Sequence, residues 1–107
     1  MKTLHTHFIG ISGTGLSAIA RVMLERGLPI SGCDRQVSPL AAALADAGVQ
    51  VYAGHNPAHL QNVDQVVRSS AIPDDNPEVQ AALAAGIPVI KRAEFLGRLV
   101  EGRQVVA

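Results

Sequence analysis

A glycine-rich turn between an apolar segment and an amphipathic segment is the feature that most constrains how this chain folds. Residues 4–9 form a short apolar run, and three glycines follow in the spacing G-x-x-G-x-G, at Gly10, Gly13 and Gly15. From Leu16 onward, apolar residues recur at helical spacing. This order predicts a strand, a tight turn and a helix whose first backbone N–H groups lack partners within the helix. Such a helix N-terminus favours an anion, above all a phosphate.

The spacing of the three glycines differs from the G-x-G-x-x-G of dinucleotide-binding enzymes. It therefore favours a phosphate-bearing ligand other than a nicotinamide cofactor. A tight turn that binds no ligand stays open as an alternative. The sequence contains no G-x-x-x-x-G-K-[ST], so we expect no ATP-binding P-loop in it.

Composition and charge narrow the class of protein. A length of 107 residues predicts one domain, residues 1–107. The 9 Lys and Arg residues balance 9 Asp and Glu residues, which argues against nucleic acid or an anionic membrane as a partner. Cys33 is the only cysteine, so no internal disulfide can form, which fits a reducing compartment. No segment resembles a signal peptide or reaches transmembrane length, and we expect a cytoplasmic protein.

Strand and helix signals alternate along the chain. Strands are expected at residues 4–9, 28–32, 49–52, 63–69 and 87–90, and helices at residues 16–26, 39–47, 77–85 and 93–100, with a brief helical turn at 57–60. Two of the helices follow a cap residue and a proline, at Ser38-Pro39 and Asn76-Pro77. This order predicts an α/β fold: a Rossmann-like, doubly wound sheet of about five parallel strands with helices on both faces, in three layers.

Polar residues follow several of the expected strands, and the carboxyl ends of parallel strands meet at one edge of the sheet. Asp34 comes 19 residues after Gly15, where such folds place an acid against ribose hydroxyls. Residues 69–72, Ser-Ser-Ala-Ile, leave the fourth strand with hydroxyl and N–H groups available to a phosphate or a base. A surface loop without a ligand is the alternative for each. His55 follows the third strand, and the residues alone favour a turn cap there over a ligand contact.

Two histidine pairs raise the question of a metal site. His5 and His7 share one face of the first expected strand, and His55 and His59 lie four residues apart. No cysteine or carboxylate lies near enough in sequence to complete an obvious site, so we expect no metal. Cys33 is expected to be a small buried residue, and no residue is assigned a catalytic role.

Seven short motifs occur in order along essentially the whole chain. They are HFIGISGTGLS at 7–17, SGCD at 31–34, GH at 54–55, SSAI at 69–72, DNPE at 75–78, GIPV at 86–89 and RAE at 92–94. Together they resemble the N-terminal domain of the Mur ligases. Two positions depart from that family's pattern: Ser12 stands where glycine is usual, and Arg68 where an aliphatic residue is usual.

The resemblance implies a cytoplasmic three-domain enzyme of peptidoglycan synthesis, whose N-terminal domain binds the UDP part of UDP-N-acetylmuramic acid. A central domain would hold ATP and Mg²⁺, and a C-terminal domain would admit the amino acid. An acyl phosphate would form on the muramic carboxylate, and the amine of L-alanine would attack it. This chain would be the UDP-binding fragment, with no cofactor and no activity of its own. Residues 104–107 look like the strand that leads toward the missing P-loop.

The resemblance also implies which residues contact UDP. The turn amides would hold the diphosphate, with the Ser17 hydroxyl assisting: Gly13, Thr14, Gly15, Leu16 and Ser17. Asp34 would meet the ribose or the uracil. The uridine pocket would be closed by His55 with Ser69, Ser70, Ala71 and Ile72.

Three alternatives stay open. Within the family, the turn sequence favours the branch that adds L-alanine over the branch that recycles muropeptides by joining a tripeptide to the same sugar nucleotide. Outside it, an NAD-binding Rossmann module and an interaction domain without a ligand are the rivals. Competition between NADH and UDP on the same sample distinguishes an NAD-binding module from a UDP-binding domain. An interaction domain without a ligand would show no saturable binding of either nucleotide.

Overall fold

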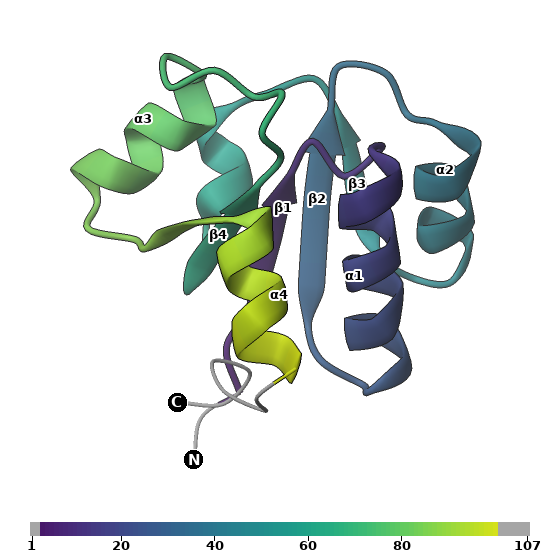
Figure 1. The fold of residues 1–107 in the computed structure, drawn as a ribbon. Helices are drawn as coiled ribbons and strands as arrows, with labels where there is room; N and C mark the ends of the chain where they lie inside the picture. Colours follow the sequence, from purple (N-terminus) through teal and green to yellow (C-terminus); the bar gives the residue numbers. More distant parts are fainter. Residues whose placement is uncertain (1–2, 101–107) are drawn as a thin grey trace.

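The computed structural model describes residues 3–100, which form one parallel sheet flanked by helices (Figure 1). The strands are β1 (Thr6–Ile9), β2 (Ile30–Asp34), β3 (Gln50–Ala53), β4 (Gln65–Arg68) and β5 (Val89–Lys91). The helices are α1 (Thr14–Glu25), α2 (Pro39–Asp46), α3 (Pro77–Ala84) and α4 (Arg92–Val100), with a short 3₁₀ helix η1 (Pro57–Leu60). The expected α/β fold with five parallel strands is confirmed. The strand suggested for residues 104–107 lies outside the described residues.

The helix starts follow from local hydrogen bonds. Ser38 Oγ accepts the backbone N–H of Ala41 at 3.2 Å, and Asn76 Oδ1 accepts that of Glu78 at 2.8 Å, so both expected caps are confirmed. The start of α1 is different. Its N-cap residue, Gly13, has no side chain to accept a hydrogen bond, so the first N–H groups of α1 are left to another partner.

Different helices cover the two faces of the sheet. On one face α1, α2 and α4 pack around a core in which Phe8 meets Phe95 edge to face, with ring centroids 6.3 Å apart. On the other face η1 and α3 pack around Ile9 and Val79. Successive side chains of a strand point to opposite faces, so β1 directs Phe8 to the first face and His7 to the second. The three expected layers are confirmed. None of the helices within residues 3–100 combines the length and apolarity needed to cross a bilayer.

The strand limits differ from expectation by one or two residues, for local reasons. β1 starts one residue after His5, whose N–H donates to the Asp64 carboxylate at 2.8 Å. β2 starts after Pro29, which has no N–H to give to a ladder, and continues to Asp34, which pairs with Ala53. Asp34 is therefore the last residue of β2, at the carboxyl edge of the sheet.

The strand order β3-β2-β1-β4-β5 reverses beside β1. From β1 the chain proceeds to β2 and β3 on one side, and then crosses to β4 and β5 on the other. Open α/β sheets bind ligands at the carboxyl ends of the strands, where the order reverses. The glycine turn (residues 10–15), Asp34 and the loop at residues 69–74 all lie at that edge.

Candidate functional site

A cleft of about 460 Å³ lies at the carboxyl edge, between the glycine turn and loop 69–74. We call it the rim cleft. Six of the residues expected to contact UDP line it: Gly13, Asp34, His55, Ser69, Ala71 and Ile72. Residues far apart in the sequence are thus brought to one cavity by the strand order.

The other five expected residues do not line the rim cleft: residues 14–17 form the first turn of α1, and Ser70 lines a neighbouring hollow. The Ser17 hydroxyl donates to the Thr14 carbonyl at 3.2 Å, and its backbone N–H donates to the Gly13 carbonyl at 2.9 Å, so both groups are engaged inside α1. The Leu16 side chain is buried in the core. Within residues 3–100 no protein acceptor takes the backbone N–H groups of Thr14, Gly15 and Leu16. These three amides, rather than Ser17, are the donors that α1 offers to an anion.

A cation that sequence reasoning did not select lies against the turn. A Cβ placed on Gly15 would come within 3.0 Å of Arg92 Cδ and 3.2 Å of Arg92 Nε. Arg92 is the first residue of α4 and also lines a neighbouring hollow of about 250 Å³ with Arg68, Ser70 and Lys91. The N-terminus of α1 therefore combines free amides with an adjacent guanidinium, a pairing suited to phosphate.

Asp34 both lines the cleft and holds the turn. Its Oδ2 accepts the Ser12 N–H at 3.0 Å, and its Oδ1 accepts the Arg35 N–H at 2.8 Å. The Ser12 hydroxyl donates to the Gln36 carbonyl at 2.7 Å and accepts the Ser38 N–H at 3.0 Å. The residue that departs from the family's glycine thus fastens the turn to the loop after β2. The carboxylate oxygens of Asp34 keep further lone pairs for a ligand hydroxyl.

The opposite wall of the cleft is loop 69–74, and Arg68 secures it. Its guanidinium pairs with Asp74 Oδ1 at 2.6 Å and donates to the Ile72 carbonyl. The wall also lies close to the glycine turn, because a Cβ placed on Gly10 would come within 2.8 Å of Ser69 Cβ. Gly10 also has a left-handed backbone conformation, with φ +90°. The Arg68 side chain is 12% exposed and acts as a clamp on the loop.

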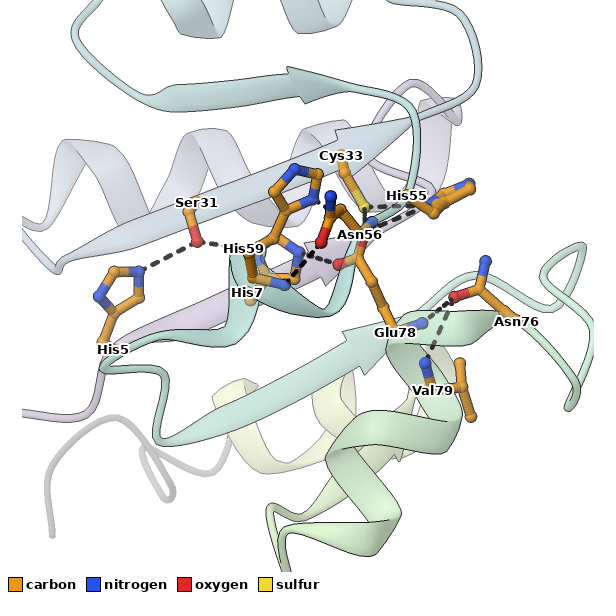
Figure 2. Close-up of polar contacts among 11 residues, drawn as sticks. His5, His7, Ser31, Cys33, His55, Asn56, His59, Asn76, Glu78 and Val79 are labelled. Atoms are coloured by element: carbon orange, nitrogen blue, oxygen red, sulfur yellow. Dashed lines mark hydrogen bonds and ion pairs between the residues drawn. The ribbon is translucent and has the colours of Figure 1, made fainter.

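Beneath the cleft, four side chains surround the buried carboxylate of Glu78 (Figure 2). His7 Nε2 lies 2.6 Å from Oε1, while His59 Nδ1 and the Cys33 thiol each lie 3.0 Å from Oε2. His55 Nδ1 lies 3.2 Å from Cys33 Sγ and 3.4 Å from Oε2. We call these five residues the Glu78 network. His55 belongs to both the network and the rim cleft.

The network determines the ionisation of two of its members. Burial alone favours the neutral acid at Glu78, but hydrogen bonds from His7, Cys33 and His59 outweigh it and lower the pKa of the carboxyl to about 2. Burial and the neighbouring carboxylate raise the pKa of the Cys33 thiol above its ordinary value. Glu78 is therefore an anion at neutral pH and Cys33 a protonated thiol, and the expected burial of Cys33 is confirmed.

Glu78 was missed as a site residue because the sequence shows it only as part of a helix start. His7 and Glu78 are 71 residues apart, and only the strand order and the placement of α3 bring them together. Sequence spacing had suggested no cysteine or carboxylate near the histidine pairs. In space, Cys33 and Glu78 join one histidine from each pair, His7 and His59.

Comparison with known proteins identifies the family of this chain. The family model described as "Mur ligase family, catalytic domain" matches residues 5–104. The chain belongs to the Mur ligase family. Among its Mur ligase relatives, the UDP-N-acetylmuramate–L-alanine ligase of Acidothermus cellulolyticus is 49% identical over 95% of this chain and 21% of its own length. The ligase of the same name from Laribacter hongkongensis is 45% identical over 99% of this chain and 23% of its own length.

Solved structures of Mur ligases share the fold. The UDP-N-acetylmuramate-alanine ligase of Thermotoga maritima matches with a TM-score of 0.88 and 26% identity, over 92% of this chain and 23% of that chain. The UDP-N-acetylmuramate:L-alanyl-gamma-D-glutamyl-meso-diaminopimelate ligase from Neisseria meningitides matches with a TM-score of 0.81 and 31% identity, over 90% of this chain and 31% of that one. The chain thus spans about a fifth of the length of the curated Mur ligases that it matches.

Proposed function

We propose that residues 1–107 form one domain that binds the UDP part of UDP-N-acetylmuramate within a longer ligase. The observation that carries this proposal is the rim cleft at the reversal of strand order, where a carboxylate and a histidine line the cavity and the unpartnered amides of α1 begin one residue after Gly13 on its wall. The names of the Mur ligases that this chain resembles supply the sugar nucleotide. The cytoplasmic location expected from the sequence belongs to the same proposal.

The diphosphate would lie over the N-terminus of α1. The N–H groups of Thr14, Gly15 and Leu16 would donate to its oxygens, and the Arg92 guanidinium would balance part of its charge. Ser17 would support this arrangement from inside α1, through its bond to Thr14.

The nucleoside would occupy the rim cleft. Asp34 would accept hydrogen bonds from the ribose or from the uracil N–H. His55 would close one side, and the loop with Ser69, Ala71 and Ile72 would close the other, while Ser70 of the same loop would face the neighbouring hollow. Gly13 would leave room for the ligand at the entrance to the turn.

The whole protein would be an ATP-dependent ligase that adds L-alanine to the muramic carboxylate. The residues present here do not fit ATP and Mg²⁺, because the sequence has no P-loop motif, and no step of that chemistry is assigned to them. The tripeptide ligase of the Neisseria structure is the second candidate. The L-alanine enzyme is favoured because relatives of that name reach 49% identity over nearly the whole chain.

Calorimetric titration of the 107-residue chain tests the proposal. UDP-N-acetylmuramic acid and UDP should bind saturably and compete with each other, and NADH should not displace them. Binding should be weak, because hydrogen bonds to an anion contribute about 1.5–3 kcal/mol each while association costs about 4–15 kcal/mol. Saturable binding of NADH without binding of UDP would overturn the proposal. In the whole protein, phosphate release that depends on L-alanine, and not on a tripeptide, separates the two ligase candidates.

A further inference from the structure

Four side chains from four different elements point their donor atoms at one small volume (Figure 2). They are His7 on β1, Cys33 on β2, His59 on η1 and Glu78 on α3, and one atom of each lies within 4.8 Å of the others. We call them the four-residue cluster. His7, Cys33 and Glu78 are buried, and the His59 side chain is 13% exposed. Groups spread over 71 residues of sequence are thus gathered under the rim cleft.

The donor atoms are held in place by contacts outside the cluster. His7 Nδ1 lies 2.8 Å from Ser31 Oγ, which leaves His7 Nε2 to face the cluster. The His59 ring stacks on Tyr52, with centroids 3.8 Å apart and planes 12° from parallel, while its Nδ1 faces Glu78. Partners that orient a ligand's ring in this way are the usual surroundings of metal-bound histidine.

The donor set suits one class of ion. Two imidazole nitrogens, one sulfur and one carboxylate oxygen are ligands of zinc and related transition metals, whereas magnesium and calcium prefer oxygen alone. A thiolate and a carboxylate together carry the two negative charges that balance a divalent ion. Four protein ligands also match the closed coordination of structural zinc sites.

The dimensions are close to those of a tetrahedral site. Zinc bonds of about 2.0–2.3 Å place ligand atoms about 3.3–3.8 Å apart. Cys33 Sγ and His59 Nδ1 lie 3.0 Å from Glu78 Oε2, and His7 Nε2 lies 2.6 Å from Oε1, so these pairs would separate by less than about 1 Å. The four donor atoms lie within 4.8 Å of one another, so the wider pairs would approach by at most about 1.5 Å. Within residues 3–100, every buried side-chain polar atom already has a hydrogen-bond partner, so protons occupy the positions that a metal would take.

We propose that His7, Cys33, His59 and Glu78 form a tetrahedral binding site for zinc or a similar transition-metal ion. Binding removes the thiol proton of Cys33, which passes to solvent. The protons that His7 Nε2 and His59 Nδ1 hold toward Glu78 also leave these two nitrogens through solvent, so each ligand is a neutral imidazole with its one proton on the other ring nitrogen. His55 then donates a hydrogen bond from Nδ1 to the metal-bound sulfur. The ion ties β1, β2, η1 and α3 together beneath the rim cleft and has no part in the transfer chemistry.

The test uses tag-free protein that has been stripped of metal with a chelator. Zinc is titrated in competition with a coloured zinc indicator, and cobalt is used as a spectroscopic substitute. We expect one zinc per chain and a cobalt spectrum with a sulfur-to-metal charge-transfer band and tetrahedral d–d bands. At free zinc about 100 times the Kd, the unfolding temperature should rise by about 10–20 °C.

Variants separate direct ligands from surroundings. Loss of an orienting partner lowers metal affinity about 10–100-fold, so we expect a loss of zinc affinity in that range for Ser31→Ala. Replacement of a ligand, in Cys33→Ser or His59→Gln, should lower zinc affinity about 100-fold or more. Cys33→Ser should also abolish the cobalt charge-transfer band. His5→Gln, a histidine outside the cluster, should keep one zinc per chain.

Two results overturn the proposal: a wild-type chain that binds no zinc, and a zinc affinity that Cys33→Ser and His59→Gln leave unchanged. Circular dichroism of the metal-free variants establishes that they fold. If Cys33→Ser does not fold, His59→Gln decides the matter, since it alters the most exposed of the four ligands.

Discussion

The backbone N–H of Ser12 donates to Asp34 Oδ2 at 3.0 Å, so the carboxylate proposed to receive the nucleoside also fixes the turn proposed to receive the diphosphate. Asp34→Ala should therefore weaken UDP binding about tenfold or more and lower the free energy of unfolding by about 1–2 kcal/mol. Asp34→Asn keeps an acceptor for Ser12 and should recover most of the stability but not the affinity. Titration calorimetry measures the affinity for UDP, and urea unfolding measures the free energy of unfolding. If Asp34→Asn recovered the affinity together with the stability, the result would contradict a ligand role for Asp34.

Arg92 should contribute to binding only when the ligand carries phosphate. Because its side chain lies against Gly15 at the start of α1, Arg92→Ala should weaken UDP binding about 3–30-fold and leave uridine binding unchanged. Comparison of the two ligands by calorimetry or ligand-observed NMR provides the measurement. Arg26→Ala, a substitution beyond the opposite end of α1, serves as the control. An equal loss for uridine and UDP would show that Arg92 acts through the fold.

Gly10 should tolerate a methyl group less well than a glycine of the same backbone conformation. Gly10 and Gly54 have φ +90° and +91°, but only at Gly10 would a Cβ meet other atoms, 2.8 Å from Ser69 Cβ and 3.2 Å from Ile72 Cγ1. Both alanine variants incur about 1–2 kcal/mol for the left-handed backbone. Gly10→Ala should lose a further 1–3 kcal/mol, approximately, from overpacking. Urea unfolding of Gly10→Ala and Gly54→Ala gives the steric contribution as the difference between their losses in free energy of unfolding. Similar losses in the two variants would refute the close approach of the glycine turn to loop 69–74.

Arg68 should act on the mobility of loop 69–74 more than on global stability. Its partner Asp74 is 90% exposed, and exposed ion pairs contribute about 0–1 kcal/mol. Arg68→Gln removes the clamp on Asp74 and the Ile72 carbonyl, so amide exchange in residues 69–74 should accelerate and UDP affinity should fall. Arg98→Gln, which breaks the Arg98–Glu94 pair on α4, should change neither. Unchanged exchange in the loop of the Arg68 variant would rule out the clamp.

Local sequence signals were sufficient for the order of elements in this fold. The cap-plus-proline pairs at Ser38 and Asn76 form hydrogen bonds that depend only on neighbouring residues, so their helices start where expected. Strand ends were less predictable. β1 starts late because His5 bonds to Asp64, a residue 59 positions away that no local pattern indicates.

The candidate site was predictable where a strand end alone defines it. Asp34 and Ser69 follow β2 and β4, so a parallel sheet must bring them to one edge. Arg92 and Glu78 were not predictable in this way. Arg92 reaches the turn because α4 packs beside α1, and Glu78 reaches His7 because α3 covers the second face. Both depend on helix packing, which spacing along the chain does not encode.

The crossover between β3 and β4 divides the chain into two halves that join in the sheet through β1 and β4. Each half gives one side of the rim cleft, with Asp34 on the first and Ile72 on the second. The cluster beneath is divided in the same way, with Cys33 in the first half and Glu78 in the second. A nucleotide above and an ion below would therefore each bridge the two halves, and each would stabilise the pairing of β1 with β4 at a different depth of the molecule.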